Sequence, residues 1–142
     1  MPEQNITALG FDLGSSWIGT AVGQTHTCTA SPLEAIRAQK FKPDWSRIQS
    51  LINTWQPDRL VVGLPTTMHD QEHEMTQQAR RFSRQLEGRF HIKTELIDER
   101  LTTREAWQIL EQQASKKHGK PTIDCIAAVL ITETWLHHFR GC

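Results

Sequence analysis

Hydrophobic and polar positions divide the first part of the chain into short segments that fit β-strands. Apolar residues dominate residues 6–12 and 17–23, and the polar turn Gly14-Ser15-Ser16 separates them. A third short segment covers residues 27–30, after which Pro32 limits further pairing. Because such short connections join neighbouring antiparallel strands, the pattern predicts an antiparallel meander.

The middle of the chain alternates between helical periodicity and a continuous apolar run. Residues 45–55 place their apolar side chains on one helical face, and Asp44 is the predicted N-cap. Residues 59–65 form an apolar run that is typical of a parallel strand covered on both faces. A second helix is predicted over residues 72–87, with Gly88 as its stop.

The last third of the chain adds one strand and two helices to this pattern. The strand covers residues 91–97, and a capping box of Thr102 and Glu105 begins the next helix. The final helix is predicted over residues 122–138. The order predicts a single α/β domain, residues 1–142, with a mixed five-stranded sheet: three antiparallel strands, then two parallel strands, flanked by helices.

Composition narrows the functional classes. The 142 residues carry 16 basic and 16 acidic side chains, so a nucleic-acid ligand would need a local basic patch rather than a basic protein. Cys28, Cys125 and Cys142 are odd in number and lack CxxC spacing, so we expect free thiols in a reducing compartment. The sequence shows neither a signal peptide nor an apolar run long enough for a bilayer, so we expect a cytoplasmic protein and no membrane partner.

Carboxylates at the ends of predicted elements are the candidate chemistry. Asp12 ends the first strand, Asp98 and Glu99 end the fifth, and Asp124 lies in the first turn of the last helix. Because reactive groups gather outside the carboxyl ends of strands in α/β sheets, these acids are expected to converge. Neighbouring carboxylates raise one another's pKa unless cations join them, and oxygen ligands favour Mg²⁺ or Mn²⁺. Two such ions would suit phosphodiester hydrolysis.

Each acid alone also fits a structural role. Asp12 could accept hydrogen bonds from turn amides, and Asp124 could favour the positive end of a helix. Asp98 and Glu99 could cap or lie at the surface. Only the joint pattern of acids at one sheet edge favours a metal site.

Four motifs in register carry a family resemblance. The chain contains, in order, Gly10-Phe11-Asp12-Leu13-Gly14 with Ile18-Gly19-Thr20-Ala21, Val61-Val62-Gly63-Leu64-Pro65, Asp98-Glu99-Arg100-Leu101-Thr102-Thr103 and Ile123-Asp124-Cys125-Ile126-Ala127-Ala128. Together they resemble the YqgF family, also called RuvX, a family of Holliday junction resolvases similar to RuvC. The resemblance implies a ribonuclease H-like fold and a metal-dependent nuclease.

Carried over residue by residue, the resemblance implies an acidic site of Asp12, Glu99 and Asp124, with Asp98 as a candidate fourth member. Strand alternation puts Asp98 and Glu99 on opposite faces, so one of them should face the metals, and Glu99 is favoured. The implied reaction is processing of the 5′ end of precursor 16S ribosomal RNA, in contact with ribosomal particles. Cleavage of branched DNA and a non-catalytic RNA-binding role in ribosome assembly stay open, as does the choice between monomer and homodimer.

Basic and polar residues near these motifs are the candidate nucleic-acid contacts. Two arginines would clamp phosphate, a lysine loop would contact the backbone or simply be solvated, and two serines stand where the family usually has a basic residue. Trp17 is a candidate for base stacking, although core packing is the favoured interpretation. The candidate contacts are Arg100, Arg104, Lys116, Lys117, Lys120, Ser15 and Ser16.

Overall fold

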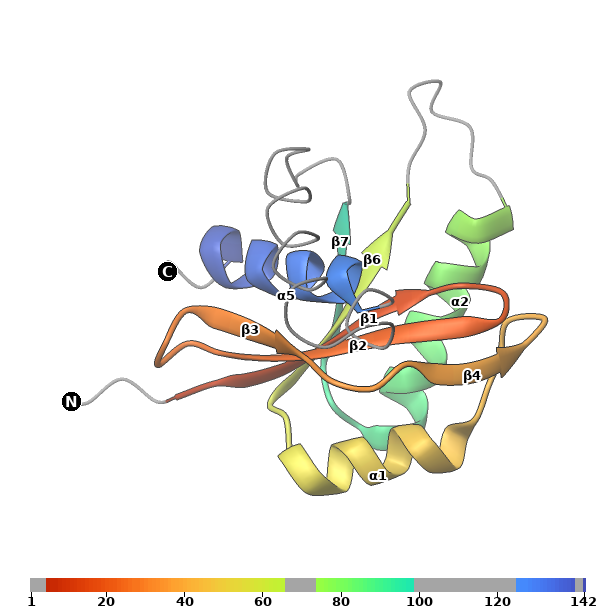
Figure 1. Cartoon of the computed structure of the whole chain (residues 1–142), viewed down its shortest axis with the longest axis horizontal. Helices are drawn as coiled ribbons and strands as arrows, with labels where there is room; N and C mark the ends of the chain where they lie inside the picture. Colours follow the sequence, from red (N-terminus) through yellow and green to blue (C-terminus); the bar gives the residue numbers. More distant parts are fainter. Residues whose placement is uncertain (1–4, 66–73, 99–124, 140–141) are drawn as a thin grey trace, which may run out of the picture.

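The computed structural model of the chain describes residues 5–65, 74–98, 125–139 and 142 (Figure 1). Its strands form one mixed sheet in the order β5-β4-β2-β1-β6-β7, and β3 pairs with β2. The strands are β1 (Thr7–Leu13), β2 (Trp17–Gln24), β3 (Thr29–Pro32), β4 (Ile36–Gln39), β5 (Lys42–Pro43), β6 (Arg59–Leu64) and β7 (Thr94–Asp98). The helices are α1 (Trp45–Trp55), α2 (Glu74–Phe90) and α5 (Ile126–Phe139).

The predicted α/β sheet is confirmed in its topology. The first three strands pair antiparallel, and β6 lies parallel between β1 and β7. The prediction of five strands is wrong for the described part of the chain, which also contains β4 and β5. These two strands are short, and together they extend the antiparallel edge beyond β2.

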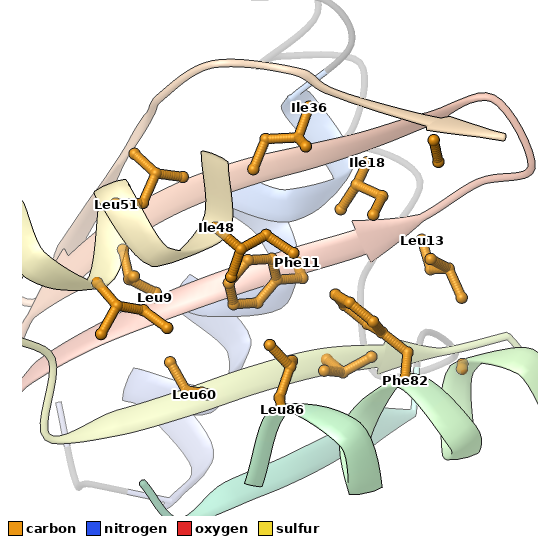
Figure 2. Close-up of a cluster of buried hydrophobic side chains, with 14 of the residues drawn as sticks. Leu9, Phe11, Leu13, Ile18, Ile36, Ile48, Leu51, Leu60, Phe82 and Leu86 are labelled. Carbon is orange, nitrogen blue, oxygen red and sulfur yellow. The ribbon is translucent and has the colours of Figure 1, made fainter. Parts of the chain in front are cut away.

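Helices α1 and α2 cover one face of the sheet, which we call the α1–α2 face. Figure 2 shows its core, in which Leu9 and Phe11 of β1 point toward Ile48 of α1 and Phe82 of α2. The Phe11 and Phe82 rings meet edge to face, with centroids 5.6 Å apart. This packing holds β1 at the centre of the molecule.

Helix α5 covers the opposite face, which we call the α5 face. Its Ile131, Trp135 and Leu136 are buried against residues of β1, β6 and β7. A Cβ atom added at Gly10 would lie 1.8 Å from Thr132 Oγ1, so only glycine lets α5 approach β1 this closely. The glycine of the first motif is therefore a packing requirement.

One predicted helix boundary is confirmed and one needs correction. Asp44 takes the N-cap position of α1, but its side chain makes no cap hydrogen bond, and Lys42–Pro43 form a strand. Gly88 does not stop α2, which continues to Phe90. The left-handed residue is His91, at φ 56°, and its N–H donates to Glu87 O at 2.9 Å. Histidine is one of the few non-glycine residues that enter this conformation readily.

The prediction of free thiols is wrong for two cysteines. Cys28 and Cys142 form a disulfide, with Cα atoms 5.5 Å apart and a sequence separation of 114. Cys125 is buried and does not take part in the disulfide. Sequence spacing could not reveal a contact that only the folded C-terminus creates. None of the helices in the described part of the chain is long and apolar enough to cross a membrane.

Candidate active site at the edge of the sheet

Asp12 lies at the carboxyl end of the central strand β1 and is half-buried. Side chains alternate along a strand, and Gly10, two residues earlier, faces α5. Asp12 therefore lies on the α5 face. Its partner across the β1–β2 pair is Gly19, a residue without a side chain that could cover the carboxylate.

Asp98 ends β7 and pairs with Leu64 of β6. It lies two strands from Asp12, or roughly 10 Å at ordinary strand spacing. Leu96 packs on the α1–α2 face, whereas Ile97 packs against α5. By alternation, Asp98 lies on the α1–α2 face. The structure thus brings Asp12 and Asp98 to one edge of the sheet but on opposite faces.

The chain enters α5 beside this same edge. Cys125 is buried, and its Sγ atom accepts a hydrogen bond from the Thr20 N–H at 3.4 Å. Thr20 adjoins Gly19, which is the partner of Asp12. The residue that directly precedes Cys125 in sequence is the predicted ligand Asp124. The described contacts therefore bring the chain to the α5 face of β2, next to Asp12.

Several predicted site residues lie outside the described part of the chain, so their roles stay predictions. The helix predicted from Thr102 falls outside it as well. The site residues concerned are Glu99, Asp124, Arg100, Arg104, Lys116, Lys117 and Lys120.

Within the described residues, no three histidine, cysteine, aspartate or glutamate side chains gather into a metal-binding group. Asp12 offers carboxylate oxygens, which are the donors that Mg²⁺ and Mn²⁺ prefer. Its chemistry therefore fits a hard divalent cation, and the other donors would have to come from residues beyond the described ranges.

Ser15 and Ser16 are exposed in the turn between β1 and β2. Their backbone carbonyls accept hydrogen bonds from Phe41 N at 3.1 Å and Ala38 N at 2.8 Å. The turn therefore supports the β4–β5 hairpin, which sequence reasoning missed. The only sequence signal for this hairpin was the alternation of apolar and polar residues over residues 36–39.

Electrostatics beside this hairpin involve Asp44. Ser46 Oγ donates to Asp44 Oδ1 at 2.6 Å, and this hydrogen bond holds the pKa of the exposed carboxyl below its ordinary value of 3.8. Nearby, Arg47 forms an ion pair with Glu34. These acids are engaged by neighbours on α1 and the segment before β4.

Comparison with known proteins adds independent findings. Residues 6–138 match the RuvX family, described as Holliday junction resolvase. A protein of Legionella pneumophila is 49% identical over 129 residues, covering 90% of this chain and 93% of that protein. One of Saccharophagus degradans is 44% identical over 130 residues, covering 91% and 92%. Both carry the name "Putative pre-16S rRNA nuclease".

Among solved structures, RuvC of Thermus thermophilus is similar, with a TM-score of 0.59 at 12% identity over 93% of this chain and 96% of that chain. This likeness confirms the predicted ribonuclease H-like fold. The family match spans nearly the whole sequence, and the relatives are similar over nearly their full length. The chain therefore belongs to the RuvX family.

Proposed function

We propose that this protein is a divalent-metal-dependent nuclease that cleaves phosphodiester bonds of RNA during 5′-end processing of precursor 16S rRNA. Its family is one of nucleases, and relatives 44–49% identical to it are named for the pre-16S substrate. The observation that carries the catalytic part is the position of Asp12, at the carboxyl end of the central strand and on the α5 face.

Three carboxylates are proposed to hold the cations. Asp12, which comes from the central strand, would be one of the residues that hold the ions. Glu99 is favoured over Asp98 because Glu95 and Ile97, at the same alternate positions of the strand, face α5, as Asp12 does. Asp124 precedes Cys125, which is held beside β2. The bound ions would supply an activated water and offset charge at the leaving oxygen.

Basic residues are proposed to hold the phosphate backbone while the acids act. Arg100 and Arg104 follow Glu99 in sequence and would orient the scissile phosphate through paired hydrogen bonds. Lys116, Lys117 and Lys120 precede Asp124 and would contact the phosphates further along. In this scheme Ser15 and Ser16 supply hydroxyl groups near the β1–β2 turn.

Branched DNA is the second candidate substrate. The family description names the Holliday junction, and T. thermophilus RuvC, with which this chain shares its fold, is known in complex with a Holliday junction substrate. Paired cuts at a junction would call for a two-fold homodimer, whereas end processing by a monomer would not. A non-catalytic role in ribosome assembly would need no metal.

The deciding experiment compares wild-type protein with Asp12→Asn on a precursor 16S rRNA fragment and on a four-way DNA junction. Both substrates are tested with Mg²⁺, with Mn²⁺ and with a chelator. We expect metal-dependent cleavage of the RNA, and a loss of at least ~100-fold in Asp12→Asn, because even outer-shell changes at metal sites cost 10–100-fold.

The matched control is Asp58→Asn, at the opposite end of β1. Asp58 Oδ2 accepts from Thr7 N at 3.0 Å, and the amide oxygen of asparagine can accept the same hydrogen bond. This variant should cleave like the wild type. Preferential cleavage of the junction would show that branched DNA, not RNA, is the substrate. RNA binding without cleavage in any metal would show that the protein is a binding protein and not a nuclease.

A further inference from the structure

Trp17 is held in place at the surface. Among the described residues, it and Phe139 are the exposed large hydrophobic side chains, and Trp17 is 47% exposed. Its backbone is the first residue of β2 and pairs with Arg37 of β4. The Arg37 guanidinium carbon lies 5.4 Å from the centre of the Trp17 ring, which is a cation–π contact. The expectation that Trp17 packs in the core is therefore wrong.

Trp17 lies on the same face of the sheet as Asp12. Gly19 pairs with Asp12, and Trp17 is two residues from Gly19, so alternation places both side chains on the α5 face. Two strand residues span roughly 7 Å. A polymer that crosses the Asp12 edge on this face would therefore pass close to Trp17.

The β4–β5 hairpin places lysines beside this tryptophan. Its two central residues, Lys40 and Phe41, have φ values of 50° and 66°, a left-handed conformation that costs non-glycine residues roughly 1–2 kcal/mol each. Phe41 packs against the core of the α1–α2 face, whereas Lys40 and Lys42 are exposed.

Two hollows flank the hairpin. The first, of about 700 Å³, is lined by Ser16, Trp17, Arg37 and the hairpin, and the second, of about 330 Å³, extends to Arg81 of α2. Lys40 and Lys42 line both. The described residues that line these hollows include no carboxylate. In Figure 1, β4 runs beside the turn that joins β1 to β2, so the hollows lie at one end of the sheet.

An aromatic face among cations matches the chemistry of single-stranded nucleic acid. Phosphates form ion pairs with lysine and arginine, and an unpaired base can stack on an indole ring. In a duplex, each base already stacks on its neighbours. An acidic peptide would form ion pairs with the lysines and the arginine but would not stack on the Trp17 ring.

We propose that the hollow formed by Trp17, Arg37, Lys40 and Lys42 binds a single strand of nucleic acid, with Trp17 stacking on a base and the three cations on phosphates. This inference rests on the proposed function, because it supplies the segment of substrate that lies next to the cleavage site. According to this inference, the enzyme selects substrates that have an unpaired segment beside the scissile bond.

The test measures binding separately from cleavage. Fluorescence anisotropy of a short labelled single-stranded RNA is recorded with a chelator, so that no cut is required. Trp17→Ala should weaken binding by roughly 5- to 150-fold, which is the loss expected for one base stack, and Trp17→Phe should restore most of it. Phe139→Ala, which removes the other exposed aromatic at 52% exposure, is the matched control and should bind like the wild type.

Salt dependence tests the lysines. Lys40→Gln with Lys42→Gln should lower the slope of log affinity against log salt by about 1.4, since each phosphate contact to a single strand contributes about 0.7. Lys93→Gln, at an exposed lysine before β7, should leave the slope unchanged. Circular dichroism confirms that each variant is folded.

The outcomes separate the inference from the proposed function. Unchanged binding by Trp17→Ala, or equal affinity for blunt duplex or polyglutamate, overturns the inference even where Asp12→Asn abolishes cleavage. Weakened binding by Trp17→Ala with full cleavage by Asp12→Asn supports the inference and overturns the proposed catalytic site.

Discussion

Replacement of Gly10 by alanine should be severely destabilising, although it adds one methyl group. The new Cβ would lie 1.8 Å from Thr132 Oγ1, 3.1 Å from Thr132 Cβ and 3.2 Å from Ala128 O. Thr132 cannot rotate away freely, because its Oγ1 donates to Ala128 O at 2.7 Å and its Cγ2 faces Gly23. Helix α5 must therefore move away from β1.

Overpacking of a dense core costs about 1–3 kcal/mol, and a contact this short belongs at the upper end. For a domain of this size, that loss lowers Tm by roughly 6–10 °C. Because α5 begins immediately after Cys125, which lies beside the Asp12 edge, cleavage should fall together with stability.

Urea unfolding of Gly10→Ala, Thr132→Ala and the double variant measures the effect. Thr132→Ala alone should cost about 1 kcal/mol through the lost hydrogen bond. The double variant should be more stable than Gly10→Ala, since the clashing oxygen is gone. Additive losses, or a Gly10→Ala protein within about 0.5 kcal/mol of the wild type, would refute the close approach as the reason for glycine.

Two further predictions concern other contacts. Cys142→Ser should lower the free energy of unfolding by about 3–4 kcal/mol under oxidising conditions, because the Cys28 bridge closes a loop of more than a hundred residues; equal stabilities without reductant would contradict the bridge. Ser46→Ala should raise the pKa of Asp44 toward 3.8, because it removes the hydrogen bond that stabilises the carboxylate. In the wild type, the lowered pKa contributes folding stability at pH values above 3.8, and this contribution is lost as the pH falls through the lowered pKa. The variant should lack this contribution. A carboxyl titration by NMR that is the same in both proteins would exclude Ser46 as the cause.

Apolar periodicity predicted the elements that form the centre of the fold. α1 and α2 each bury one helical face, whereas β1, β2 and β6 are buried in continuous apolar runs, and both patterns are visible in the sequence. β4 and β5 were not predicted, because each has few residues. In addition, their turn, Lys40–Phe41, lacks the Asn-Gly signature of two-residue hairpins. Tertiary contacts with the β1–β2 turn hold that hairpin in place.

The candidate site was predictable only in part. A carboxylate at the end of a buried strand made Asp12 a candidate, and alternation placed Asp98 and Glu99 on opposite faces. The face on which Asp98 lies relative to Asp12 became clear only from the packing of Leu96 and Ile97. The exposure of Trp17 was not predictable, because an apolar residue at a strand start fits burial equally well. Its partner Arg37 belongs to a strand that the sequence did not reveal.

The Cys28–Cys142 bridge has a practical consequence for attachment. It ties the last residue to the loop between β2 and β3, while Trp17 begins β2 at its other end. The eight residues of β2 hold these two points roughly 24 Å apart. A tag or surface linker fused after Cys142 would project from the side of the molecule remote from Asp12 and Trp17. Protein immobilised through this linker should therefore keep the edge of the sheet that carries Asp12 and Trp17 accessible to long RNA.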